Sequence, residues 1–244
     1  MAELTPMMKQ YLQIKEQNQD AILFFRLGDF YEMFGDDARK ASKELDLTLT
    51  TRDKDKNKSF EEKIPMCGIP YHASDAYIAR LIAKGYKVAI CEQTEDPATA
   101  KGLVDRDIIR IITPGTVTES CMLDESKNNY IGCIYGESGK FGLAFCDVST
   151  GAFFTTVCSD AQNVASELGR FAPSEILRYG SNVDCEVIED AVFRRLSCCV
   201  SEGKPELFGL ESAESLLEDH FHATLSQMGI AGVRNMQGGK MTHS

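Results

Sequence analysis

No apolar run in this sequence approaches the ~20 residues needed to cross a bilayer, because charged or turn residues interrupt every run. The first residues also lack the basic and apolar regions of a secretory signal peptide. Hydrophobic residues make up 43% and charged residues 26%, a composition typical of a globular protein with a core. We therefore expect a cytoplasmic protein without membrane association, long enough for one large domain or two ordinary ones.

The nine cysteines include no pair with the C-x-x-C spacing of a zinc site. Many stand alone inside apolar stretches. Cys198 and Cys199 are adjacent, which suits neither a routine disulfide nor a metal site. We interpret all nine as small apolar side chains in a reduced cytosol. The sequence thus predicts no metal site.

Motifs of common enzymes are also missing. The Gly136–Lys140 segment lacks the earlier glycine and the following Ser or Thr of a phosphate-binding loop, so we interpret it as a hairpin turn. There is no G-x-S-x-G elbow and no H-E-x-x-H. Asp147 ends an apolar strand and is a candidate first carboxylate of a two-metal nuclease, but no clear partner carboxylates accompany it. A strand-end turn aspartate is the simpler interpretation, and we expect no catalytic residues.

The net charge of -11 argues against a simple nucleic-acid binder, because phosphate contacts need Lys and Arg. The charge is unevenly distributed. Basic and acidic side chains nearly balance over residues 1–115, whereas residues 116–244 carry most of the acidic excess. If this chain contacts DNA, we expect its first half to do so.

Apolar periodicity and turn residues predict two successive α/β regions. Thr5 and Pro6 are typical of a helix start, and Ser74 is a candidate cap for a second helix. A polar stretch near residues 118–129 looks like a linker, and the glycine-rich residues 229–244 have no periodic apolar face. The expected helices cover residues 5–18, 30–45, a segment after Ser74, 161–171 and 216–228, and the expected strands cover residues 21–27, 47–50, 88–91, 108–112, 130–135, 141–147, 152–157 and 175–177. Strands followed by helices in the second region fit an α/β layer with an antiparallel hairpin at its edge.

The most informative block is Arg26–Phe34, in which a glycine turn is followed by three aromatic residues and a carboxylate. Aromatic residues at a strand-to-helix junction usually belong to the core. On a helix, however, Phe30 and Tyr31 diverge by about 100°, so one ring is expected at the surface beside Glu32. The residues alone leave exposure and burial of Phe30 equally open.

Phe30-Tyr31-Glu32 resembles the Phe-x-Glu signature of the MutS mismatch-repair family. Further segments match the family in order over roughly residues 5–180, and several of them are unusual in themselves. The matching segments are TPMMKQY (5–11), IPMCGIPYHA (64–73), AICEQ (89–93), DPA (96–98), RIITPGT (110–116) and DVSTG (147–151). The resemblance weakens after about residue 203 and is lost after residue 228.

The resemblance implies an α+β mixed-sheet mismatch-recognition domain over residues 1–116 and a linker over residues 117–128. A ribonuclease H-like α/β connector domain, incomplete in this chain, is expected over residues 129–228, and an irregular tail over residues 229–244. The family's ATPase would lie outside this chain. We therefore expect no enzyme activity and no cofactor here, although the full-length family uses ATP and magnesium.

The resemblance also implies site residues. The Phe of the motif, Phe30 here, would wedge into the duplex from the minor groove and stack on a mispaired base, and Glu32 would hydrogen-bond that base. Arg52 matches a position that contacts the DNA backbone, and Met66 one that lies along the minor groove. Lys54, Lys56 and Lys58 are either phosphate contacts or part of a solvated loop.

The implied partners are double-stranded DNA with mismatches and a MutL-type protein. The full-length family is dimeric, whereas a chain of this length is expected to be a monomer. Two alternatives remain open at this point. The chain is a non-catalytic interaction module that docks MutL or another repair partner, or it is a metal-dependent nuclease that uses Asp147.

Overall fold

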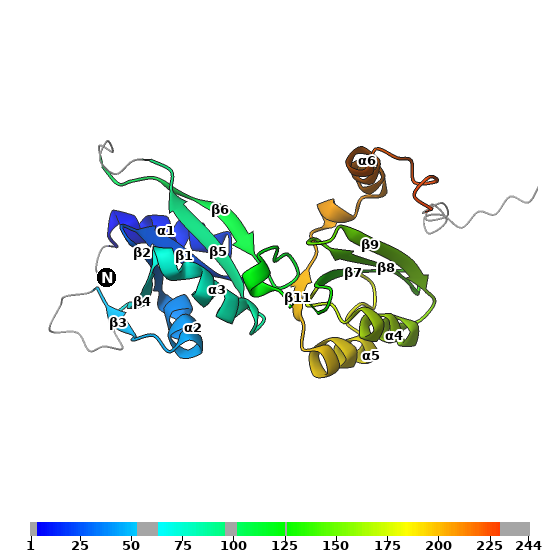
Figure 1. The fold of residues 1–244 in the computed structure, drawn as a ribbon, viewed down its shortest axis with the longest axis horizontal. Coiled ribbons are helices and arrows are strands. Elements are labelled where there is room, and N and C mark those ends of the chain that lie inside the picture. Colours follow the sequence, from blue (N-terminus) through cyan, green and yellow to red (C-terminus); the bar gives the residue numbers. More distant parts are fainter. Residues whose placement is uncertain (1–3, 53–62, 96–101, 125, 230–244) are drawn as a thin grey trace, which may run out of the picture. The chain divides into compact units, whose positions relative to one another are not determined.

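The computed structural model describes residues 4–52, 63–95, 102–124 and 126–229. The chain divides into two compact units, Met1–Ser126 and Lys127–Ser244, and each is described here by itself (Figure 1). No helix among these residues combines the length and the apolar character that a bilayer crossing requires.

The first unit is built on a six-stranded mixed sheet with the order β3-β4-β2-β1-β5-β6. β1 and β5 are parallel, and every other neighbouring pair is antiparallel. The strands are β1 (Ala21–Leu27), β2 (Phe30–Phe34), β3 (Thr50–Thr51), β4 (Pro65–Pro70), β5 (Lys87–Gln93) and β6 (Arg106–Ile112). Because β2 pairs with β1 and β4, it lies inside the sheet rather than at its edge.

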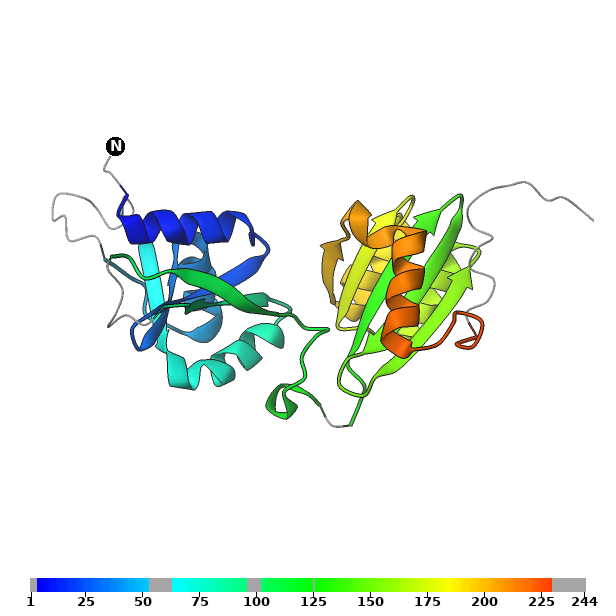
Figure 2. The same ribbon diagram turned by 90° about the horizontal axis from the view of Figure 1, so that it is seen from above.

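Helices cover both faces of this sheet, as both views of the ribbon show (Figures 1 and 2). On one face, α1 (Pro6–Glu16) buries Met8 and Tyr11 against side chains of β1. On the other face, α2 (Gly35–Leu45) and α3 (Ser74–Ile82) pack on the alternate residues of β1 and β2. Two short 3-10 helices, η2 (Tyr71–Ala73) and η3 (Ser120–Met122), also belong to this unit.

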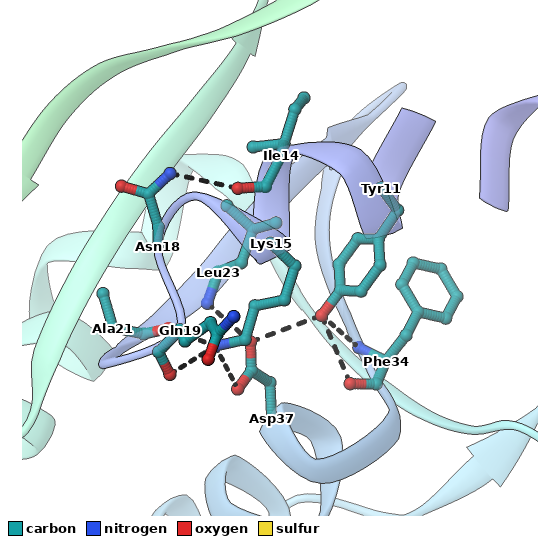
Figure 3. Close-up of polar contacts among 9 residues, drawn as sticks. All are labelled: Tyr11, Ile14, Lys15, Asn18, Gln19, Ala21, Leu23, Phe34 and Asp37. Carbon is teal, nitrogen blue, oxygen red and sulfur yellow. Dashed lines mark hydrogen bonds and ion pairs between the residues drawn. The ribbon is translucent and has the colours of Figure 1, made fainter. Parts of the chain in front are cut away.

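A buried carboxylate joins α1, β1 and α2 (Figure 3). Asp37, at the start of α2, is only 2% exposed. Its Oδ2 accepts hydrogen bonds from the Leu23 N–H at 2.9 Å and the Tyr11 hydroxyl at 3.3 Å, and its Oδ1 lies 2.9 Å from Lys15 Nζ. Lys15 also donates to the Ala21 carbonyl at 2.6 Å. A buried charge is tolerated only with such partners, so this network fixes the two helices around β1.

The second unit contains a five-stranded sheet with the order β11-β10-β7-β8-β9. In sequence order, β7, β8 and β9 form an antiparallel meander. β10 pairs parallel with β7, and β11 pairs parallel with β10. The strands are β7 (Tyr130–Glu137), β8 (Lys140–Asp147), β9 (Ala152–Cys158), β10 (Glu175–Gly180) and β11 (Cys199–Glu202).

One face of this second sheet is covered by α4 (Ala161–Phe171), α5 (Glu186–Glu189) and the π-helical turn η4 (Asp190–Leu196). After η5 (Pro205–Phe208), α6 (Leu210–Phe221) lies on the opposite face (Figures 1 and 2). α6 has no buried residue, and its Phe221 ring lies 6.0 Å from that of Phe153. Both units are mixed α/β domains, so the predicted fold class is confirmed.

Several local predictions need correction. Residues 30–34 form a strand, not the start of a helix, and the helix begins only at Gly35. α3 begins at Ser74, but the residue preceding it is Ala73 and no side chain caps it. The last helix ends at Phe221 rather than at residue 228. The eight cysteines whose side chains are described are free, as predicted. Apart from Gly229, the predicted tail lies outside the described residues.

Candidate nucleic-acid interface

The hairpin between β1 and β2 presents an exposed aromatic ring. The chain reverses at Gly28 and Asp29, and Leu27 pairs with Phe30 across the turn. Gly28 has φ +58°, a left-handed conformation that glycine adopts without strain. Phe30, the first residue of β2, is 47% exposed. The structure therefore resolves the open alternative, because the ring of Phe30 is outside the core.

Strand geometry explains why Phe30 is exposed while its neighbour is not. Successive side chains of a strand point to opposite faces, so Phe30 and Glu32 share one face and Tyr31 points to the other. Tyr31 is 6% exposed and its ring lies 5.8 Å from that of Phe24. The sequence argument expected one surface ring beside a carboxylate; the exposure is correct, but the alternation of a strand produces it rather than helical divergence.

Glu32 occupies a narrow space over β4. Gly68 lies opposite it, and a Cβ at Gly68 would be 3.4 Å from Glu32 Cγ and 3.3 Å from the Tyr31 carbonyl oxygen. Glu32 Oε1 accepts a hydrogen bond from Arg52 Nη2 at 3.0 Å, whereas its Oε2 is buried without a hydrogen-bond partner among the described residues. Burial raises the pKa of Glu32 above its ordinary value, and Arg52 opposes this only in part.

Arg52 and Met66 lie at different distances from the tip. Arg52 follows β3 directly, and its side chain is 50% exposed even though one end pairs with Glu32. Met66 belongs to β4, and it pairs with Phe34 rather than Phe30. At ~3.3 Å per residue, four residues of strand separate these pairs by roughly 13 Å. The structure thus brings Phe30, Glu32 and Arg52 together, with Met66 farther along the same face.

The remaining lysine candidates, Lys54, Lys56 and Lys58, lie outside the described residues.

A second cluster, which sequence analysis missed, supports the hairpin from the opposite face of the sheet. Arg26 donates from Nε to the Gly28 carbonyl at 2.6 Å, pairs with Glu92 at 3.3 Å and stacks on the ring of Tyr71 at 3.6 Å. The Tyr31 hydroxyl also donates to Glu92, and burial, followed by that carboxylate, raises the pKa of Tyr31. The sequence signal was an arginine two residues before the turn glycine, but its partners lie far along the chain.

This arrangement offers three functional groups on one face: a ring for stacking, a carboxyl group with one unused oxygen, and a half-exposed guanidinium. These groups suit recognition of a base and a phosphate. No group of three or more His, Cys, Asp or Glu side chains that could hold a metal ion occurs in the described part of the chain.

Asp147, the candidate nuclease carboxylate, is a turn residue of the second unit. It is 1% exposed, and it accepts hydrogen bonds from the Ser149 N–H and hydroxyl, at 2.9 and 2.6 Å, and from the Thr150 and Asn129 N–H groups. Burial acts to raise its pKa, but these hydrogen bonds outweigh burial and hold the pKa below its ordinary value. The carboxylate is thus directed at its own turn, as the simpler interpretation expected.

The two described units define a chain of two mixed α/β domains, the first of which carries the exposed Phe30 ring beside Glu32 and Arg52. Residues 5–121 match the family MutS domain I, and residues 129–238 match MutS domain II. The chain belongs to the MutS family and consists of its mismatch-recognition and connector domains.

Curated relatives agree with this assignment. The DNA mismatch repair protein MutS of Acetivibrio thermocellus is 51% identical over 224 residues, which is 91% of this chain and 25% of the relative. The MutS protein of Methanococcoides burtonii is 48% identical over 237 residues, covering 96% of this chain and 26% of the relative. That of Clostridium tetani is 53% identical over 189 residues, covering 77% and 21%. The chain therefore spans about a quarter of the length of these relatives.

Proposed function

We propose that this chain recognises mispaired bases in double-stranded DNA through the tip of the β1–β2 hairpin. In this proposal Phe30 enters the duplex from the minor groove and stacks on a mispaired base, and Glu32 hydrogen-bonds the same base. Arg52 contacts the sugar-phosphate backbone beside the mismatch. Met66, farther along β4, lies against the groove.

The physical basis is the cost of opening a base step. Inserting an apolar wedge unstacks the step and kinks the duplex, at a cost of a few kcal/mol that is lowest where pairing is already poor. Stacking on an aromatic ring returns roughly 1–3 kcal/mol per base and is independent of which base it is. A ring such as Phe30 therefore responds to how easily the helix deforms and not to its sequence.

Glu32 adds discrimination by its charge. A carboxylate close to phosphates is repelled by a normal duplex, and this repulsion is offset only where a displaced base supplies a hydrogen-bond partner. The buried Oε2, which has no hydrogen-bond partner among the described residues, is an atom that such a base can use. Burial raises the pKa of Glu32, so the carboxyl group can meet a displaced base either as a protonated donor or as an acceptor of a base N–H.

The observation that carries the proposal is the exposed Phe30 ring on the same strand face as the buried Glu32. An exposed aromatic side chain at the tip of an otherwise well-packed sheet contributes little to the core. It suits a contact made outside the domain.

A competition experiment with the 244-residue chain tests the proposal. Fluorescence anisotropy with a labelled duplex would compare a G·T mismatch with the matched sequence, at low and at physiological salt. We expect tighter binding to the mismatch, and Phe30→Ala should reduce that preference by about 5- to 150-fold, the equivalent of one stacked base.

The matched control is Phe193→Ala, since Phe193 in the second unit is 49% exposed and similarly accessible. Circular dichroism should show that both variants remain folded. Equal affinity for both duplexes, or a preference that survives Phe30→Ala, would overturn the proposal. An absence of duplex binding at either salt concentration would favour the alternative of a protein-docking module.

The wider role is also a proposal, because the chain spans about a quarter of its relatives. We infer that these two domains supply the DNA contact of a mismatch-repair protein, and that ATP hydrolysis with its magnesium ion belongs to other parts of such a protein. A MutL-type protein is the partner that the second domain would contact.

A further inference from the structure

The two side chains of the Arg52–Glu32 ion pair differ in solvent exposure. The Glu32 side chain is 11% exposed, whereas that of Arg52 is 50% exposed. Only one contact joins them, from Nη2 to Oε1 at 3.0 Å. A guanidinium carries five N–H donors in a planar fork that fits a carboxylate or a phosphate with two parallel hydrogen bonds. Among the described residues the fork makes this one hydrogen bond, and the side chain is half exposed.

The carboxylate has little else to hold it. On the strands beside it, Phe25 of β1 and Gly68 of β4 are uncharged. Arg106 of β6 also lies on this face, with its guanidinium 4.9 Å from the ring centre of Phe25. Tyr11 of α1 also faces this side, and its hydroxyl is bonded to Asp37 and Phe34. Within the described part of the chain, Arg52 is therefore the charged group whose contact opposes the rise in the pKa of Glu32.

We propose that Arg52 determines specificity by exchanging partners: it binds Glu32 in the DNA-free domain, and a phosphate of the kinked duplex takes it over, which releases Glu32 to the mispaired base. This inference deepens the proposed function and rests on it. Arg52 therefore contacts either Glu32 or the phosphate, and not both at once.

The exchange couples the phosphate contact of Arg52, which does not depend on the bases, to the contact of Glu32 with the mispaired base. A phosphate alone gains nothing if drawing Arg52 away leaves Glu32 buried without a counter-charge. A displaced base removes that penalty by hydrogen-bonding the carboxyl group. On a matched duplex no base is displaced, so Arg52 stays on Glu32 and the phosphate contact is not formed. Selectivity thus needs both residues and not Glu32 alone.

The first test needs no DNA. The pKa of the Glu32 carboxyl group would be measured by carbon-13 NMR titration of the 244-residue chain. Arg52→Met should shift that pKa upward, because the opposing charge is lost. Arg52→Lys should retain most of the effect. The matched control is Arg110→Met, because Arg110 is a similarly exposed arginine of the same unit that pairs with Glu119. We expect the control to leave the Glu32 titration unchanged.

The second test measures affinity by competition for mismatched and matched duplexes over a series of salt concentrations. Arg52→Met should weaken binding to the mismatch more than binding to the matched duplex. The salt dependence for the mismatch should fall by about one phosphate contact. In a Glu32→Gln background, Arg52→Met should weaken both duplexes equally, because no carboxylate is left to release.

The two possible failures can be told apart. If the wild-type chain shows no preference for the mismatch, the proposed function itself is wrong. If the preference is present but Arg52→Met weakens both duplexes equally, the partner exchange is wrong. A Glu32 titration that does not move in Arg52→Met overturns the exchange as well.

Discussion

The guanidinium of Arg26 lies 3.6 Å from the ring centre of Tyr71, and the same side chain donates to the Gly28 carbonyl at 2.6 Å. The Tyr71 N–H in turn donates to the Asp29 carbonyl at 3.0 Å. The turn that presents Phe30 is thus hydrogen-bonded to Arg26 of β1 and to Tyr71, which follows β4. These contacts lie on the face of the sheet opposite to Phe30. These contacts hold the tip in one conformation, which would lower the ordering cost of the proposed DNA binding.

Replacing Arg26 by Met should loosen this turn. Hydrogen bonds from a charged donor contribute about 1.5–3 kcal/mol, and stacking of a cation on a ring adds about 0.5–2 kcal/mol. We expect the free energy of unfolding to fall by about 1–3 kcal/mol in urea titrations. Amide exchange at Gly28 and Asp29 should accelerate. Arg194→Met is the control, since its exposed helical pair with Asp190 contributes only about 0.5 kcal/mol. Unchanged exchange at the turn would contradict this role of Arg26.

Lys15→Met should destabilise the first unit because it leaves Asp37 buried with two neutral donors only. Breaking a buried ion pair costs about 3–5 kcal/mol, and the partial exposure of Lys15 places the expected loss near 3 kcal/mol. Lys84→Met removes a more exposed pair with Glu44 and should cost much less than Lys15→Met. Chemical denaturation followed by circular dichroism measures the free energy of unfolding of both variants. Equal losses would show that the buried Asp37 network contributes no more to stability than the Lys84–Glu44 pair.

Glu32 should make stability depend on pH in a defined direction. Its pKa is raised in the folded chain, so its contribution is fully present below the ordinary pKa of glutamate and is lost as pH rises through the raised value. Glu32→Gln lacks this loss. We therefore expect the stability of the wild-type chain to fall relative to Glu32→Gln as the pH rises from below the ordinary pKa of glutamate through the raised pKa of Glu32. Parallel pH profiles of the two unfolding free energies would show that the carboxyl group is not perturbed.

Asp147 should behave in the opposite way. Its pKa is held below the ordinary value, so the stability it contributes is present above that value and is lost as pH falls through the depressed one. Asp147→Asn places an amide group among N–H donors and should cost about 2–3 kcal/mol at neutral pH. The loss should disappear in strong acid. Urea unfolding at several pH values tests this, and a loss independent of pH would point to packing instead of charge.

Local signals in the sequence predicted much of the secondary structure. The Thr5 hydroxyl accepts the Met8 N–H, and Pro6 occupies the first turn, as the cap pattern indicated. The helix at 161–171 was predicted with the bounds that the structure shows, since Asp160 caps it and its apolar face is regular. Where a few neighbouring residues contain the information, the sequence was sufficient.

The β2 strand was missed for a physical reason. Its five residues are apolar or aromatic except for Glu32, a pattern compatible with a helix or with a buried strand. Pairing with β1 and β4 decides in favour of the strand; β1 precedes β2 across a short turn, but β4 begins only at Pro65, far along the sequence. The Arg52–Glu32 pair was invisible for the same reason, because only the β2–β4–β3 pairing brings the two residues together.

The position of β2 inside the sheet determines which molecule has to change shape. Hydrogen bonds on both sides hold the strand that carries Phe30, so the ring rests on a rigid platform. If this strand binds a double helix as proposed, the duplex deforms more easily than the sheet. Under the proposed function, binding would then respond to the flexibility of the duplex over the few base steps at the contact.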